Sequence, residues 1–263
     1  MIERVFIFAL GAAIGSFLNV CIHRLPLGES IAWPASHCPK CRKPLFWYDN
    51  IPFISYLVLR GRCRFCKEKI SLRYFIVELL TACAFLTFFN LYGFSYEFFF
   101  YLVFVCGLLV ATFVDLRHRI IPDEISIGGM VTGLVLTAFH GFRLARIGDS
   151  LLGIVIGGGI IYLVGFLFDL VYFKLLKKPP IQGETESMGG GDVKLLAMIG
   201  AFLGWKSAVL TFFLAPFFGI IMGVINLAAK KDHTIPYGPF LSLAALVCLF
   251  WADKILSLII VTP

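Results

Sequence analysis

Residues 151–173 read LLGIVIGGGIIYLVGFLFDLVYF and contain one charged side chain, Asp169. A helix of this length can cross a bilayer, because about 20 apolar residues span the hydrocarbon core. The whole chain has the same character: 59% of its 263 residues are hydrophobic and 15% are charged, against about 25% charged residues in soluble domains. This composition excludes a soluble globular domain, a disordered chain and a disulfide-rich scaffold. It predicts an all-α polytopic membrane protein.

The apolar runs predict about eight transmembrane helices. The predicted spans lie near 2–22, 73–92, 97–114, 121–140, 150–173, 193–205, 207–229 and 238–260. The sixth span is too short to cross a bilayer alone. The first is expected to be retained and not removed as a signal peptide, because no small-residue cleavage site follows it. We therefore expect a first helix at 1–23, a polar domain at 24–72 and a membrane-embedded domain at 73–263.

The basic residues predict an orientation through the positive-inside rule. If the N-terminus lies outside the cytoplasm, 18 of the 23 Lys and Arg residues face inward, and ten of these lie in the loop 23–73. Both termini are therefore expected on the non-cytoplasmic side, with the polar domain in the cytoplasm. Retention at the inner face and contact with anionic lipids account for the net charge of +7 without a nucleic-acid partner.

The polar domain contains two C-x2-C pairs, CPKC at 38–41 and CRFC at 63–66, separated by 21 residues. Two such pairs present four thiolates to one tetrahedral ion, and zinc suits that geometry best. Two disulfides or free thiols are the alternative, which a reducing cytoplasm disfavours. We expect Cys38, Cys41, Cys63 and Cys66 to hold a structural zinc, because catalytic zinc keeps one ligand position open.

Two aspartates occupy the edges of predicted spans. Asp115 ends the third span in FVDLRHRIIPDE, and Asp192 opens the sixth in MGGGDVKLLAMIGAFLG. Two spans and a loop separate them, so the chain returns to the same membrane face and the carboxylates can meet. Two nearby carboxylates share one proton, and such a pair can activate water and protonate a leaving amine. This combination predicts peptide hydrolysis without a covalent intermediate.

The glycines before Asp192 admit a second interpretation. A hinge loop followed by an N-cap aspartate would also produce GGGD. The second edge aspartate and the lack of G-x-S-x-G, H-E-x-x-H or a Walker loop favour catalysis. Gly189, Gly191 and Asp123 are expected to support the catalytic loop, although Asp123 after Pro122 is also a common helix-start residue.

Several segments together resemble the bacterial type IV prepilin peptidases, the GxGD-type membrane aspartyl proteases of peptidase family A24. The matching segments are GSFLNVCIHRLP at 15–26, CPKC and CRFC, WYDNIPFISYL at 47–57, RYFIVELLTA at 73–82, DLRHRIIPD at 115–123, GGGDVKLLAMIGAFLG at 189–204 and IPYGPFL at 235–241. The resemblance implies that Asp115 and Asp192 are the catalytic aspartates. It also implies a bacterial cytoplasmic (inner) membrane location.

The resemblance implies two activities as well. Such enzymes cleave the leader of type IV prepilins and pseudopilins at the cytoplasmic membrane face. They then methylate the new N-terminal residue with S-adenosylmethionine as the methyl donor. The sequence itself shows no soluble-type methyltransferase fingerprint. Asn19 and Glu78 are expected to belong to a substrate or methyl-donor region.

Other classes of function stay open at this stage. A transporter would use the aspartates as a proton relay, and a scaffold would use the cysteine domain to dock a partner. A peptidase without methyltransferase activity, or a methyltransferase with degenerate protease function, would keep one of the two activities.

Overall fold

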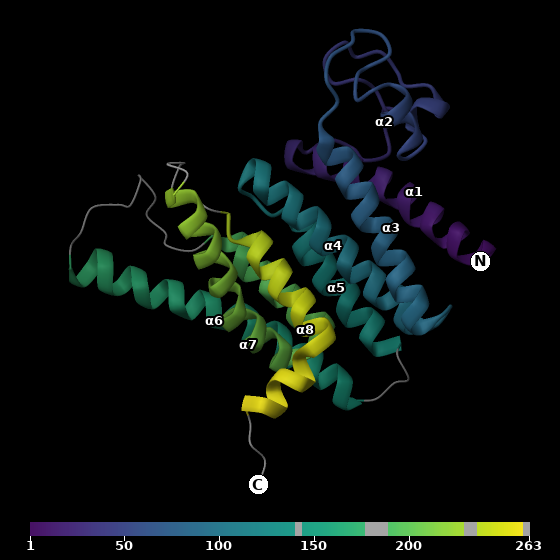
Figure 1. Cartoon of the computed structure of the whole chain (residues 1–263). Coiled ribbons are helices and arrows are strands. Elements are labelled where there is room, and N and C mark those ends of the chain that lie inside the picture. The colour runs from purple at the N-terminus through teal and green to yellow at the C-terminus, as the bar shows by residue number, and fades with distance from the viewer. Residues whose placement is uncertain (140–143, 177–188, 229–235, 260–263) are drawn as a thin grey trace. The chain divides into compact units, whose positions relative to one another are not determined.

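A computed structural model describes residues 1–139, 144–176, 189–228 and 236–259. The described residues are helical with irregular connections and contain no β-strand, as predicted for an all-α fold (Figure 1). The long helices are α1 (Ile2–Arg24), α3 (Leu72–Tyr92), α4 (Tyr96–His118), α5 (Asp123–Phe139), α6 (Leu144–Asp169), α7 (Gly190–Ala228) and α8 (Gly238–Ile259). Short elements are the 3-10 turns η1 (Leu25–Leu27) and η2 (Trp47–Asn50), the helix α2 (Ile54–Val58) and a π-helical turn, Leu170–Leu175.

Within the described residues, six helices are long and apolar enough to cross a membrane, namely α1, α3, α4, α6, α7 and α8. The protein is therefore a multi-pass membrane protein. The difference from about eight predicted spans has two causes. Helix α5 has only 17 residues, and the sixth and seventh predicted spans form the single element α7.

Helix α7 contains a kink where those two spans were expected to separate. Gly204 has φ +79° and ψ 171°, which is not helical backbone. A residue with a side chain is strained at this positive φ, whereas glycine adopts it readily. The segment before Gly204 is thus a short helix, in agreement with a sixth span that cannot cross a bilayer alone.

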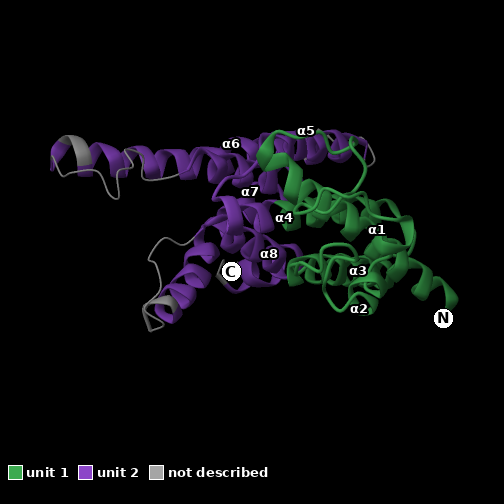
Figure 2. Cartoon of the chain, turned by 90° about the horizontal axis from the view of Figure 1, so that it is seen from above, with its two compact units in different colours: residues 1–110 green, residues 111–263 purple. Residues whose placement is uncertain are grey.

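The chain divides into two compact units, Met1–Val110 and Ala111–Pro263, coloured separately in Figure 2. In the first unit α1 packs along α3, with little space between the backbones. A Cβ at Gly15 of α1 would lie 2.7 Å from the Cα of Glu78 on α3. The segment between these two helices carries α2 and lies at their ends (Figure 1). The predicted boundaries at 23, 72 and 73 stay a prediction.

In the second unit α6 packs most closely against α7. A Cβ at Gly153 or at Gly200 would overlap the carbonyl group of the other glycine. One turn further along α6, a Cβ at Gly157 would lie 2.6 Å from the carbonyl oxygen of Leu196. Small residues allow such backbone approach in membranes, where dispersion contacts replace the hydrophobic effect as the force between helices.

This packing predicts that Gly200→Ala destabilises the protein. The new methyl group must push α6 away from α7, and overpacking of this kind costs roughly 1–3 kcal/mol. Gly159→Ala is the matched control, because Gly159 lies on the same helix pair with nothing within 4 Å of its Cβ position. Thermal unfolding in detergent should show a lower Tm for Gly200→Ala alone. Equal Tm values for the two variants would contradict the role of this contact.

Candidate functional site

Asp115 lies in the last turn of α4, and Asp192 lies in the first turn of α7. Asp115 is buried, with 6% of its surface exposed, and Asp192 is half-buried. The two carboxylates are close enough to interact electrostatically. The aspartates that the sequence singled out are therefore brought together within the second unit, although 77 positions separate them in the chain.

The backbone of Gly238, at the start of α8, holds Asp115 in place. Its N–H donates a hydrogen bond of 2.9 Å to Oδ2 of Asp115. A Cβ at Gly238 would lie 2.7 Å from that same oxygen, so a side chain there would obstruct the approach. Arg119 also interacts electrostatically with Asp115.

Of the three glycines before Asp192, only Gly191 lies where a side chain would be tight against a neighbour. A Cβ at Gly189 would be 3.5 Å from Oδ2 of Asp192, and one at Gly191 would be 3.2 Å from the side chain of Ile121. The N–H of Asp192 donates to the carbonyl oxygen of Gly189 at 3.0 Å. The turn therefore folds tightly around the carboxylate.

Asp123 lies apart from this arrangement, at the first residue of α5. Its Oδ1 accepts a bond of 2.6 Å from Nζ of Lys194, and 59% of its side chain is exposed. The ion pair joins the beginning of α5 to the beginning of α7. Asp123 thus contacts the helix that carries Asp192, and its support of the catalytic loop stays a prediction.

Tyr237 and Gly238 were not singled out by reasoning from residue types. Burial and the negative charge of Asp192 raise the pKa of Tyr237 to about 12, so its hydroxyl keeps its proton and can donate a hydrogen bond. The sequence signal for these two residues was the segment IPYGPFL, which contains both. Reasoning from charge and hydropathy does not mark this segment as functional.

The four cysteines of the first unit form one cluster. Their Sγ atoms all lie within 4.8 Å of one another, and Cys38 Sγ lies 3.8 Å from Cys66 Sγ. Zinc–sulfur bonds of about 2.3 Å in a tetrahedron place sulfurs roughly 3.8 Å apart. The residues present therefore fit a tetrahedral metal ion, as the spacing predicted.

Both cysteine pairs have the same backbone design. The first cysteine of each pair donates its N–H to the residue five positions later and accepts an N–H from the residue four positions later. The equivalent residues are Cys38 and Cys63, Arg42 and Lys67, and Lys43 and Glu68. The residue four positions after the first cysteine, Arg42 or Lys67, has a positive φ in both pairs, 55° and 59°. Each pair is thus a tight knuckle that points its thiols to one place.

Contacts between side chains join the second knuckle to residues 46–49, which follow the first knuckle in the chain. Arg64 of the second knuckle donates to both oxygens of Asp49 at 2.6–3.0 Å, and its guanidinium lies over the ring of Tyr48. The rings of Phe46 and Phe65 are 5.8 Å apart. A hydrogen bond from the Cys66 N–H lowers the pKa of the Cys63 thiol to about 7, which favours the thiolate that a metal binds.

Asn19 and Glu78 lie on α1 and α3 of the first unit, and both are buried. The Asn19 amide donates to the carbonyl oxygens of Gly15 and Tyr74 at 3.3 and 3.0 Å. Oε2 of Glu78 accepts the N–H of Phe53 at 3.0 Å. These bonds show both residues joining α1, α3 and the segment before α2. Their assignment to a substrate or methyl-donor region stays a prediction.

Comparison with known proteins agrees with the two-part organisation. Residues 9–92 match the family model described as the bacterial peptidase A24 N-terminal domain, and residues 102–224 match that of the type IV leader peptidase family. No solved structure matches the chain.

Three curated relatives carry the name prepilin leader peptidase/N-methyltransferase. The protein of Myxococcus xanthus is 40% identical over 86% of this chain, and the match covers 63% of that protein's length. The protein of Stutzerimonas stutzeri is 36% identical over 94% of this chain and 90% of its own length. The protein of Pseudomonas aeruginosa is 36% identical over 94% and 89%. The chain therefore belongs to the type IV leader peptidase family, the enzymes of the prepilin leader peptidase/N-methyltransferase class.

Proposed function

We propose that this protein cleaves the leader of type IV prepilins and pseudopilins with Asp115 and Asp192, then methylates the new N-terminus. The observation that carries the peptidase proposal is the meeting of two aspartates at helix ends beside the Gly238 N–H. Family membership supports the reaction class and gives no support to the transporter alternative.

The dyad can perform general acid–base hydrolysis. The ionised carboxylate takes a proton from water, whose oxygen attacks the peptide carbonyl carbon. The protonated carboxyl donates to the carbonyl oxygen, and the resulting intermediate breaks its C–N bond as the leaving nitrogen receives a proton. The Gly238 N–H donates to Oδ2 of Asp115 and so orients this carboxyl group.

We place the enzyme in a bacterial cytoplasmic membrane, with both termini outside and the zinc domain in the cytoplasm. The distribution of Lys and Arg supports this orientation. A prepilin has an apolar helix preceded by a basic leader, so it can reach the dyad by lateral diffusion with its scissile bond at the membrane edge. Membrane lipids are therefore part of the working environment.

We assign zinc to the four cysteines and S-adenosylmethionine to the methylation step. Zinc would link the two knuckles of a segment that has little apolar core of its own. S-adenosylmethionine, when bound, supplies a methyl group whose C–S bond breaks as a C–N bond forms to the amine, which releases a proton. A peptidase that lacks this second activity is the alternative, and it would give a cleaved product without added mass.

The dyad proposal predicts that Asp115→Asn and Asp192→Asn each abolish cleavage. An amide cannot exchange the proton, and loss of acid–base catalysis costs about 10²-fold or more in rate. The measurement is a mass-spectrometric cleavage assay with purified enzyme and a synthetic prepilin, with and without S-adenosylmethionine. Wild-type product should also gain the mass of a methyl group when the donor is present.

Two controls accompany this assay. Asp253→Asn changes an exposed acid on α8 and should leave cleavage unchanged. Asp123→Asn removes an exposed ion pair with Lys194, which is worth about 0–1 kcal/mol. The rate of cleavage should therefore fall less than tenfold. Cleavage that persists in either dyad variant would contradict the assignment.

The zinc proposal predicts one zinc ion per chain, lost in Cys63→Ser. Three thiolates and one hydroxyl bind zinc far more weakly than four thiolates, and metal binding is coupled to folding here. Metal analysis by mass spectrometry measures the ion, and limited proteolysis at the basic residues of the loop measures its folding. Cys83→Ala changes a cysteine outside the cluster and should retain the metal. Full zinc in Cys63→Ser would exclude a four-thiolate site.

A further inference from the structure

Helix α2 exposes apolar side chains on one face. Ile54, Leu57 and Val58 are 58%, 65% and 70% exposed. Their spacing of i, i+3 and i+4 places the three side chains together on the helix surface, and we call this surface the apolar face. The two hydroxyl groups of α2, on Ser55 and Tyr56, donate instead to backbone carbonyl oxygens at 2.8 and 3.5 Å. Clustered apolar exposure of this kind marks a contact with a partner or a membrane.

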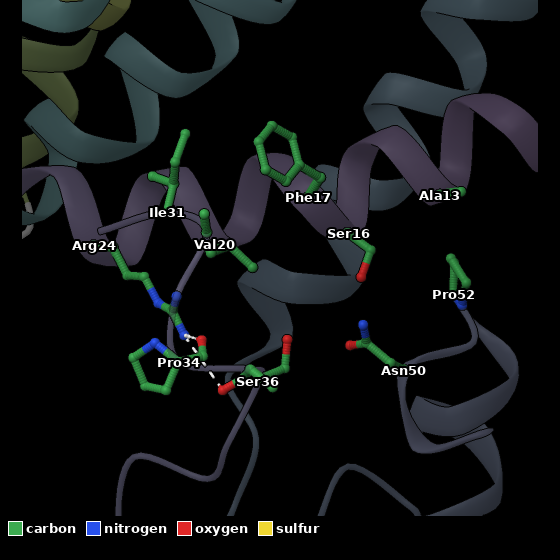
Figure 3. Close-up of a pocket in the computed structure, with 12 residues that line it drawn as sticks. Ala13, Ser16, Phe17, Val20, Arg24, Ile31, Pro34, Ser36, Asn50 and Pro52 are labelled. Carbon is green, nitrogen blue, oxygen red and sulfur yellow. Dashed lines mark hydrogen bonds between the residues drawn. The ribbon is translucent and has the colours of Figure 1, made fainter. Parts of the chain in front are cut away.

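The residues before α2 lie beside the middle of α1. A pocket of about 320 Å³ lies between α1 and the loop that follows it, with Arg24 at one end (Figure 3). At the other end Asn50 and Pro52 line the pocket together with Ala13 and Ser16 of α1. Ala13 lies eleven residues before Arg24, which is roughly 16 Å along the helix axis. The chain therefore enters α2 well away from the end of α1.

Phe53 joins this segment to both long helices. Its N–H donates to Oε2 of Glu78 on α3 at 3.0 Å. Its ring lies 5.8 Å from the ring of Phe8 on α1 and 5.3 Å from the ring of Phe75 on α3. All three partners lie inside helices that are long and apolar enough to cross a membrane. Glu78 is six residues from the start of α3, or about 9 Å along its axis. Phe53 therefore lies alongside two membrane-spanning helices.

The residues after α2 are basic. Residues 60–73 contain six Lys and Arg residues and one acid, Glu68. Arg60 and Arg62 are exposed, and their N–H groups donate to carbonyl oxygens at the C-terminal end of α2 at 3.0 and 3.1 Å. Apolar side chains on one helix face with basic residues beside them are typical of segments that lie in the membrane interface. Lys and Arg near that surface are attracted to anionic lipid headgroups.

A prepilin is the other candidate to cover the apolar face. The basic residues beside this face disfavour a prepilin, because the leader that precedes its apolar helix is itself basic and like charges at an interface repel. Anionic lipid has the complementary charge. Lipid also surrounds the helices α1 and α3, against which Phe53 packs.

We propose that α2 lies in the membrane interface, with Ile54, Leu57 and Val58 among the acyl chains of the adjoining leaflet. Arg60 and Arg62 then lie at the phosphate groups of anionic lipids. Lipid covers the apolar face, and α2 anchors the cysteine-containing segment to the membrane surface. This inference goes beyond the proposed reaction and does not depend on it, because it needs only the membrane-spanning helices of the first unit.

The test measures lipid contact in the full-length protein, reconstituted into nanodiscs without prepilin. A fluorescent amino acid replaces Leu57, and the discs contain either ordinary phospholipids or phospholipids with brominated acyl chains. An interfacial helix buries its apolar face roughly 5–10 Å deep, where bromine quenches by contact, so the fluorescence should fall at least about twofold. The same probe at Lys40, an exposed residue of the first knuckle, should keep its fluorescence.

A second probe position keeps the test decisive if the first replacement disturbs the fold. Val58 is as exposed as Leu57, and a probe there should be quenched in the same way. Thermal unfolding in detergent reports whether each labelled protein is folded, and this readout depends on neither cleavage nor methylation.

The charge of the lipid tests the role assigned to the two arginines. At equal mole fractions, brominated phosphatidylglycerol should quench the probe at Leu57 about twofold more strongly than brominated phosphatidylcholine, because basic residues enrich anionic lipid nearby. The double variant Arg60→Gln/Arg62→Gln should remove this difference. Lys40→Gln removes a basic residue outside the region that follows α2 and should preserve it.

Three results would overturn the proposal. Fluorescence that brominated lipid leaves unchanged at both Leu57 and Val58 would place the apolar face in water. Equal quenching at Lys40 would show that lipid contact is not a property of this face. Probes that respond to added prepilin and not to brominated lipid would assign the face to the substrate.

Discussion

The close contact between α6 and α7 is the constraint on which the proposed active site depends. Gly153 meets Gly200, and successive contacts along the helices bring Gly157 to Leu196 and Gly158 to Val193. This row of contacts ends one residue from Asp192. Helix α7 therefore lies against α6 right up to its first turn, and the position of the Asp192 carboxylate follows from backbone packing. A residue so placed has little freedom to move relative to α6, and general acid–base catalysis requires catalytic groups in fixed positions.

Hydropathy and spacing predicted the parts of this protein that follow local rules. Long apolar runs became helices, because a backbone in lipid must satisfy its own hydrogen bonds. The two C-x2-C pairs came together because each forms a knuckle by itself. Asp115 and Asp192 could be paired because the sequence predicted two spans between them, of which the structure makes only α6 long enough to cross a membrane. The break in α7 was also indicated, although as two separate spans and not as a kink at Gly204.

The contacts made by backbone atoms and by distant segments could not be predicted in this way. The hydrogen bond from the Gly238 N–H to Asp115 joins residues 123 positions apart. No sequence pattern around this glycine indicates that bond. The pocket beside Arg24 depends on how the loop 30–36 folds back on α1, where backbone carbonyls hold the guanidinium. Asn19 and Glu78 are polar residues of predicted spans, where polar groups are costly. The structure shows them bonding backbone groups, which is one way to meet that cost.

The proposed dyad would use one type of side chain in two catalytic roles. Asp115 ends a helix and accepts a backbone N–H, whereas Asp192 begins a helix and lies beside Tyr237. Helix ends carry partial charges of opposite sign, so two identical carboxyls stand in different electrostatic surroundings. A pair that shares one proton needs such a difference, because acid and base must be distinct at each step. Helix ends at the membrane edge supply this electrostatic difference without further residues. A carboxylate at the N-terminal end of one helix already differs from a carboxylate at the C-terminal end of another.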